Sequence, residues 1–192
     1  MNTPAHAVLN LALLERGARA DVGVWVIVGA VLPDVPNGLF FAYHRFALGL
    51  DPTFIYEHLY PSATWQAVLA PWHSVWLVLA LLALARWRRS AAAVGLALSM
   101  GLHLLADLVT HTGDAHPHLY PVSDLRFVSP ISYWDAAAGA RWFVPLELLG
   151  VMAASAVAWR RGNQWWRRLL LAASCVWLLV AYLAGWSFWG TG

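Results

Sequence analysis

The sequence predicts an all-α, polytopic membrane bundle of about six helices, two short and four longer, because apolar runs of helical length dominate it. Of its 192 residues, 60% are hydrophobic and only 11% are charged. An average soluble domain carries about a quarter charged residues. We therefore expect a single integral-membrane domain over residues 1–192.

Two short apolar runs come first, at roughly 4–14 and 22–33. Thr3 is a suitable N-cap for the first. Pro33 and Pro36 are expected to end the second, because proline lacks the N–H that a helix interior needs. At about 1.5 Å per residue, neither run is long enough to cross a bilayer as a helix.

Four longer runs and two polar connections follow. A hydrocarbon core takes about 20 helical residues, which predicts spans at roughly 64–85, 91–111, 142–159 and 169–187. Connections of the length of 35–63 and 112–141 are usually functional or disordered. Their many aromatic residues favour two ordered outer loops that cap the bundle.

Arginine predicts the orientation. All basic residues are arginines, and most of them fall in the three short connections: Arg16, Arg19, Arg86, Arg88, Arg89, Arg160, Arg161, Arg167 and Arg168. By the positive-inside rule these connections are cytoplasmic. The two long loops are then expected to face the opposite side.

Charge and cysteine content exclude other classes. The net charge of +2 and the scattered arginines do not form the basic face of a nucleic-acid-binding protein. A single cysteine, Cys175, allows neither a disulfide framework nor a thiolate metal site.

A few ionisable residues interrupt the apolar runs, namely His6, Asp34, His73, His103, Asp107 and Glu147. Such residues are costly in a membrane and are functional candidates. His73 precedes Arg86 by thirteen residues, and His103 follows Arg89 by fourteen. At 1.5 Å per residue both lie about 20 Å from the arginine-rich face. Similar spacings place Asp34 and Glu147 at the same level, as a metal centre would require.

His103 and Asp107 are the strongest pair, because a spacing of four places both on one helical face. Imidazole nitrogen and carboxylate oxygen form a normal ligand set for zinc or another divalent ion. Alternatively, the two could be a neutral pair that bridges helices.

Structural alternatives exist for the other residues as well. His6 could cap its own helix, and Asp34 could end the second helix. His73 could bond a backbone carbonyl freed by a kink at Pro71. Glu147 is expected to hydrogen-bond between helices rather than bind metal.

The segment 111–118 is the densest polar cluster. His111, Asp114 and His116 are candidate acid–base residues, and together with His118 they could bind a second metal. The alternative is a solvated loop whose histidines titrate. Arg45 or Arg126 could hold a phosphate or carboxylate, which suits the guanidinium geometry.

Several of these motifs occur in a familiar order over about residues 3–125: His6, Leu32-Pro33-Asp34, His44-Arg45, His73-Ser74, Leu102-His103-Leu-Leu-Ala-Asp107 and Pro121. This order resembles the YdjM-like family of bacterial inner-membrane metal-dependent hydrolases. It is more remotely similar to helical zinc-dependent phospholipases C. The resemblance implies that His6, Asp34, His73, His103 and Asp107 are metal ligands.

We therefore expect the protein to hydrolyse a phosphoester or ester in a lipid or lipid-linked substrate. The expected cofactor is a divalent metal, and zinc is the first candidate. The site would face the periplasmic side of a bacterial inner membrane. Two other classes stay open: a metal or proton carrier, and an assembly or scaffolding protein in which the polar cluster only holds helices together.

Overall fold

The computed structural model describes residues 1–15 and 20–183, and these residues form helices and loops without any strand. Five helical segments in this part are long and apolar enough to cross a membrane: Val22–Ala47, Ala63–Trp87, Ala91–Leu108, Ala140–Arg161 and Trp165–Leu183. The predicted all-α bundle is confirmed, and the chain is a multi-pass membrane protein. Arg16, Arg19 and the end of the last predicted span lie outside the described residues.

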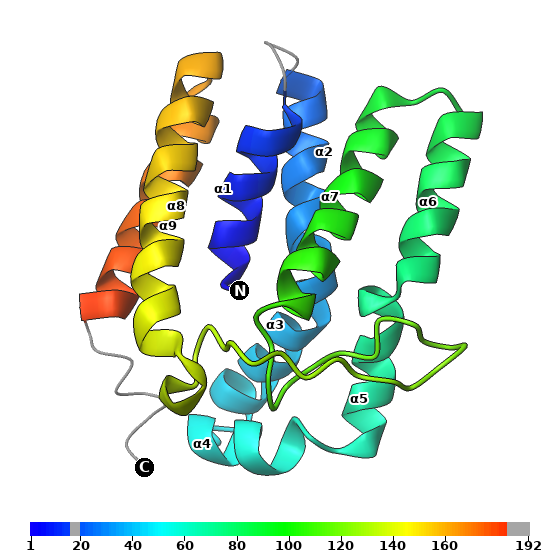
Figure 1. Ribbon diagram of the computed structural model, residues 1–192, viewed down its shortest axis with the longest axis vertical. Helices are drawn as coiled ribbons and strands as arrows, with labels where there is room; N and C mark the ends of the chain where they lie inside the picture. Colours follow the sequence, from blue (N-terminus) through cyan, green and yellow to red (C-terminus); the bar gives the residue numbers. More distant parts are fainter. Residues whose placement is uncertain (16–19, 184–192) are drawn as a thin grey trace.

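The short helix α1 (Thr3–Leu14) lies at the centre of the bundle, between α8 and α9 on one side and α2 and α7 on the other (Figure 1). Ala5, Val8 and Leu11 are fully buried in these contacts. Because α1 covers only part of the bundle's height, its first residues lie at mid-height, inside the bundle (Figure 1).

The second predicted helix, 22–33, is too short, because the chain stays helical to Ala47. The first predicted loop, 35–63, therefore begins too early. The chain from Val22 to Ala47 is one helical span of 26 residues. It consists of α2 (Ala20–Val31), a 3-10 turn (Leu32–Asp34), α3 (Val35–Ala42) and a π-helical turn (Tyr43–Ala47).

Both prolines occupy positions that a helix tolerates. Pro33 lies in the first turn of the 3-10 segment, and Pro36 lies in the first turn of α3. The missing N–H has little cost there, because first-turn N–H groups have no partner within the helix. The chain therefore continues past both prolines, with Asp34 at the junction.

Short helical turns also occupy about half of the remainder of the predicted first loop. The remainder contains α4 (Pro52–Phe54) and a π-helical turn (Ile55–Leu59) before α5 (Ala63–Leu69) begins. An ordered cap was therefore predicted correctly, but its form was not.

The next span is broken where His73 lies. A 3-10 turn (Ala70–His73) follows α5, and α6 (Val75–Trp87) begins after Ser74. Ser74 is extended, with ψ of 128°, and its hydroxyl accepts a hydrogen bond from the N–H of Trp76. This N-cap starts a new helix directly after His73.

Helices α7 (Ala91–Leu108), α8 (Ala140–Arg161) and α9 (Trp165–Leu183) complete the bundle. The second predicted loop is present between α7 and α8, with one short 3-10 turn at Ala136–Ala138. Backbone hydrogen bonds hold this loop, since Ser129 N donates to His111 O at 2.9 Å. The α6–α7 and α8–α9 connections lie at the same end of the bundle, away from this loop (Figure 1).

Candidate metal centre

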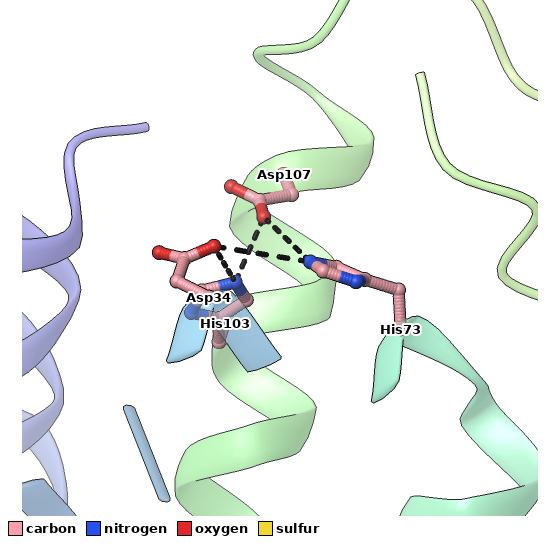
Figure 2. A group of neighbouring side chains, drawn as sticks. All are labelled: Asp34, His73, His103 and Asp107. Carbon is pink, nitrogen blue, oxygen red and sulfur yellow. Dashed lines mark ion pairs between the residues drawn. The ribbon is translucent and has the colours of Figure 1, made fainter. Parts of the chain in front are cut away.

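Asp34, His73, His103 and Asp107 come from three separate spans and meet in the bundle (Figure 2). One ligand atom from each lies within 4.8 Å of the others. His103 Nε2 lies 2.9 Å from Asp107 Oδ2 and 3.6 Å from Asp34 Oδ1. His73 Nε2 lies 3.9 Å from each of the same two oxygens. The structure thus brings together four of the five predicted ligands.

Backbone carbonyls decide which imidazole nitrogens face this cluster. Ala30 O lies 2.7 Å from His103 Nδ1, and Leu69 O lies 3.3 Å from His73 Nδ1. A carbonyl oxygen only accepts, so both Nδ1 atoms carry the proton. Each Nε2 then presents a lone pair to the cluster, where it is buried and makes no well-aligned hydrogen bond. Metal-bound histidines have this same arrangement.

The four donors fit a divalent ion. Zinc–ligand bonds of about 2.0–2.2 Å in a tetrahedron place neighbouring donor atoms about 3.4 Å apart. The four nitrogen–oxygen distances run from 2.9 to 3.9 Å around this value. His73, His103 and Asp107 are buried, whereas the Asp34 side chain is 25% exposed. The site is therefore enclosed on one side and open on the other.

His6, the fifth predicted ligand, lies beside the cluster rather than in it. Its Nε2 lies 2.9 Å from Asp107 Oδ1, and its ring stacks on His103 with the ring centroids 3.8 Å apart. Because the carboxylate oxygen accepts, His6 Nε2 is the donor in this hydrogen bond. His6 is thus placed to orient Asp107 and His103.

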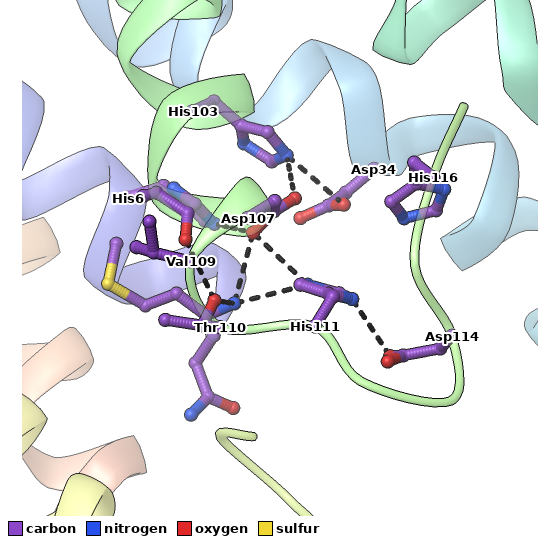
Figure 3. A network of polar contacts seen from close by, with 12 residues as sticks. His6, Asp34, His103, Asp107, Val109, Thr110, His111, Asp114 and His116 are labelled. Atoms are coloured by element: carbon purple, nitrogen blue, oxygen red, sulfur yellow. Dashed lines mark hydrogen bonds and ion pairs between the residues drawn. The ribbon is translucent and has the colours of Figure 1, made fainter. Parts of the chain in front are cut away.

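A second group of predicted residues lies on the other side of Asp107 (Figure 3). Asp107, His111 and His116 each offer a ligand atom within 4.8 Å of the others. His111 Nε2 lies 3.1 Å from Asp107 Oδ1, and His111 Nδ1 lies 2.9 Å from Asp114 Oδ2. The Met1 nitrogen also contacts Asp107 Oδ1, at 3.0 Å. The three predicted acid–base residues are therefore adjacent to the cluster of Asp34, His73, His103 and Asp107.

The surroundings of His111 and His116 shift their pKa values in opposite directions. Burial disfavours the imidazolium of His111, but the Asp107 carboxylate and the contacts with Asp107 and Asp114 raise its pKa to about 9. Burial alone would raise the pKa of Asp114, yet the neighbouring His111 lowers it. Burial, reinforced by His73 and His111, lowers the pKa of His116 well below its ordinary value. Without a bound cation, these shifts favour a protonated His111 and a neutral His116.

A cavity of about 1070 Å³ opens onto both groups. Asp34, His73, His111, Asp114 and His116 form part of its wall, while His103 and Asp107 are buried and are not among its lining residues. Aromatic and polar side chains of the helical cap and the loop complete the wall, among them Phe41, Tyr56, Glu57, Tyr60, Gln66, Tyr133 and Trp134. The cavity is far larger than a single ion needs and has room for part of a substrate.

The two arginines predicted to bind a substrate have different positions. Arg126 lines the cavity, and its Nη1 donates to Ala115 O at 2.6 Å and to Gln66 Oε1 at 3.1 Å. Arg45 is not among the cavity-lining residues of the described chain, and its Nη1 donates to Leu50 O at 3.2 Å. Only Arg126 is thus positioned to meet a ligand in this cavity.

The other histidines belong to neither group. His44 Nδ1 lies 2.8 Å from Phe40 O, and the ring of His58 stacks on Phe54. His118 Nδ1 lies 2.9 Å from His116 O. None of the three is among the described residues that line the cavity or form either ligand group.

Glu147 hydrogen-bonds between helices, as predicted. Its two oxygens accept from Asn2 N at 2.8 Å and from Asn2 Nδ2 at 2.6 Å. Thr3 is not the N-cap that was predicted, because α1 begins at Thr3 itself and Asn2 holds the N-cap position. The Thr3 hydroxyl instead donates to Asp34 Oδ2, and the tyrosines of the cavity wall had no predicted ligand-binding role. The unusual number of aromatic residues in the two polar connections was the available signal for the tyrosines.

Comparison of the chain with family models, curated proteins and solved structures gives no match. The resemblance to the YdjM-like family stays a prediction from its motifs, and the functional argument depends on the geometry described above.

Proposed function

We propose that the protein is a membrane-embedded, metal-dependent hydrolase that acts on a phosphoester or ester in a lipid or lipid-linked substrate. One observation carries the proposal. Two buried histidines, His73 and His103, bind backbone carbonyls through Nδ1 and direct unpartnered Nε2 atoms at two carboxylates beside a large cavity. A buried arrangement with that much unsatisfied ligand capacity is costly unless a cation fills it.

Asp34, His73, His103 and Asp107 are the residues that would hold the ion. Two imidazole nitrogens and two carboxylate oxygens are common zinc ligands, so we expect zinc. A bound divalent ion would supply Lewis-acid polarisation of the scissile group and a water of lowered pKa. Asp34 and His73 lie at the cavity wall, so a ligand in the cavity can reach this part of the site.

Other residues of the wall provide the remaining requirements of hydrolysis. Arg126 offers a guanidinium to an anionic group such as a phosphate. Asp114 and His111 form a carboxylate–imidazole pair 2.9 Å apart at the same wall, suited to moving a proton. The tyrosines of the cap and loop line the same cavity.

The membrane context favours a lipid substrate. Asp34 and His73 belong to segments that are apolar enough to span a bilayer. We therefore expect a substrate that is itself held in the membrane. With the arginine-rich end cytoplasmic, the cavity would face the outside.

Hydrolysis by the purified protein tests the proposal. Protein stripped with a chelator should be inactive and should regain activity with Zn²⁺ toward a phosphodiester or a phospholipid in mixed micelles. His103→Ala should abolish this activity. Glu147→Gln is the matched control, because it neutralises a buried carboxylate outside the ligand set and should retain activity.

Two results would contradict the hydrolase. Zinc flux into liposomes without turnover of any phosphoester or carboxylic ester would support a carrier. A purified protein that neither contains nor binds a divalent metal would support a scaffold whose polar residues only fix helix packing.

A further inference from the structure

Asp107 presents its two oxygens to two different sets of imidazoles. Oδ2 lies 2.9 Å from His103 Nε2 and 3.9 Å from His73 Nε2. Oδ1 faces the opposite side, where His6 Nε2 donates to it at 2.9 Å, the Met1 ammonium donates to it at 3.0 Å and His111 Nε2 lies 3.1 Å away. A cation bound at Oδ1 would take the place of the Met1 ammonium. The side chain is only 2% exposed, so neither oxygen is directed at solvent. A carboxylate in this position can bind one cation with each oxygen.

The second set has the properties of a ligand set. His111 and His116 are buried, and their ring centroids are 5.3 Å apart (Figure 3). His116 Nδ1 is buried and makes no hydrogen bond. The ring of His116 stacks on His73 at 3.7 Å, which holds the second set directly against the first.

The loop that carries these histidines is held in place from both sides. Val75 N, at the start of α6, donates to His118 O at 2.9 Å. Thr112 Oγ1 donates to Ser129 O at 3.0 Å. The positions of His111 and His116 therefore depend on the fold around them and do not require a bound ion.

We propose that Asp107, His111 and His116 form a second divalent-cation site, with Asp107 bridging it to the first. This inference depends on the metal site of the proposed function. It assigns His111 and His116 as ligands instead of acid–base residues. Asp114 then orients His111 through the 2.9 Å contact with Nδ1, as carboxylates commonly do for metal-bound histidines.

A two-cation centre narrows the substrate class. Paired cations about 3.5–4 Å apart are typical of enzymes that act on phosphoesters, where they contact the attacking and the leaving oxygen. Arg126 at the same cavity suits the remaining charge of a phosphoryl group. The second site therefore favours a phosphoester over a carboxylic ester.

Zinc stoichiometry tests the inference without any substrate. The full-length protein in detergent is stripped with a chelator, reloaded with Zn²⁺ and freed of excess metal. Elemental analysis should give two zinc ions per chain, and X-ray absorption should show a zinc–zinc distance of about 3.5–4 Å. His116→Ala should reduce the content to one zinc ion and remove the zinc–zinc signal.

Controls make a negative result informative. His118→Ala changes a neighbouring histidine outside both ligand groups and should retain two zinc ions. His116→Gln keeps a polar side chain of similar length and should also bind one ion, which tests the proposal if the alanine variant unfolds. One zinc ion per chain in both wild type and His116→Ala would overturn the second site and leave the first. No zinc in wild type would overturn both.

Discussion

Asp107 is the residue on which both proposed cation positions depend. It follows His103 by one helical turn and is almost fully buried. Its carboxylate contacts three histidines on different elements, His6, His103 and His111, at 2.9, 2.9 and 3.1 Å. A group in that position affects metal binding and packing together, so substitutions must separate the two effects.

Substitutions of Asp107 provide this separation. Asp107→Asn and Asp107→Ala should both lose metal, because an amide oxygen carries no charge and neither variant offers a carboxylate bridge. The asparagine retains shape and hydrogen-bonding capacity, so only the alanine should lose a further ~1–3 kcal/mol from unsatisfied buried partners. Elemental analysis and thermal unfolding of metal-free protein measure the two effects. Full metal occupancy in Asp107→Asn would exclude the ligand role.

His6 should behave as a positioning residue. His6→Gln replaces a donor to Asp107 by another donor and removes no proposed ligand, so the metal stoichiometry should stay that of wild type. The loss of an orienting contact should weaken metal affinity about 10–100-fold, the usual effect of an outer-sphere partner. Competition with a chelator of known affinity measures the change. Loss of a whole zinc ion would instead make His6 a direct ligand.

At the scale of elements, interruptions of helices place the ligands. The 3-10 turn after α2 carries Asp34, and the break before α6 carries His73. A continuous helix would direct its side chains by periodicity alone, whereas a break frees the backbone to aim one residue at the cluster. Only His103 and Asp107 lie on an uninterrupted helix, and their relative position was therefore predictable.

A buried ion pair holds the central helix at its other end. Arg167 on α9 donates to Glu15, which directly follows α1, and both side chains are no more than 2% exposed. Arg161 Nη1 also donates to Glu15 O, at 2.9 Å. Arg167 was predicted only as part of the cytoplasmic positive charge. The structure gives it a packing role as well.

Removal of this ion pair should lower the free energy of unfolding. Arg167→Ala leaves a buried carboxylate without its partner, which costs about 3–5 kcal/mol in comparable pairs. Arg168→Ala is the matched control, because the Arg168 guanidinium lies over the exposed face of Trp159 and should contribute about 1 kcal/mol or less. Chemical unfolding in detergent measures both. Equal stability of the two variants would show that the pair contributes nothing.

On the scale of the whole molecule, the two ends of the bundle differ in chemistry. Arginines lie in the α6–α7 connection and in the helix ends on either side of the α8–α9 connection, and the opposite end carries the helical cap, the long loop and the cavity (Figure 1). This separation makes the orientation of the protein a functional question, because it decides which compartment supplies the substrate.

Single cysteines can determine the orientation. In a Cys175→Ser background, Arg88→Cys and Asn163→Cys should be labelled by a membrane-impermeant reagent only after the cytoplasmic side is opened. Asp51→Cys and Asp124→Cys, at the other end, should be labelled in intact cells. The expectation follows from the positive-inside rule. The reverse pattern would place the cavity on the cytoplasmic side and exclude an external substrate.

Much of the candidate site was accessible to prediction. A shared depth, estimated from distances along the chain to the arginines, correctly grouped Asp34, His73 and His103, because helical rise is nearly constant. The same reasoning placed Glu147 at this level, but Glu147 hydrogen-bonds to Asn2 and joins neither ligand group. Depth along a helix does not specify which side chains face one another, because that depends on how the helices pack.

The sequence by itself determined the all-helical membrane architecture and the level of the polar residues, because hydrophobicity and helical rise are local properties. Only the tertiary structure decided what the polar residues can do. Ala30 O, on another helix, fixes the tautomer of His103, and the long loop brings His111 and His116 to the second oxygen of Asp107. These contacts join segments far apart in the chain, and no local pattern specifies which nitrogen or oxygen will face a partner.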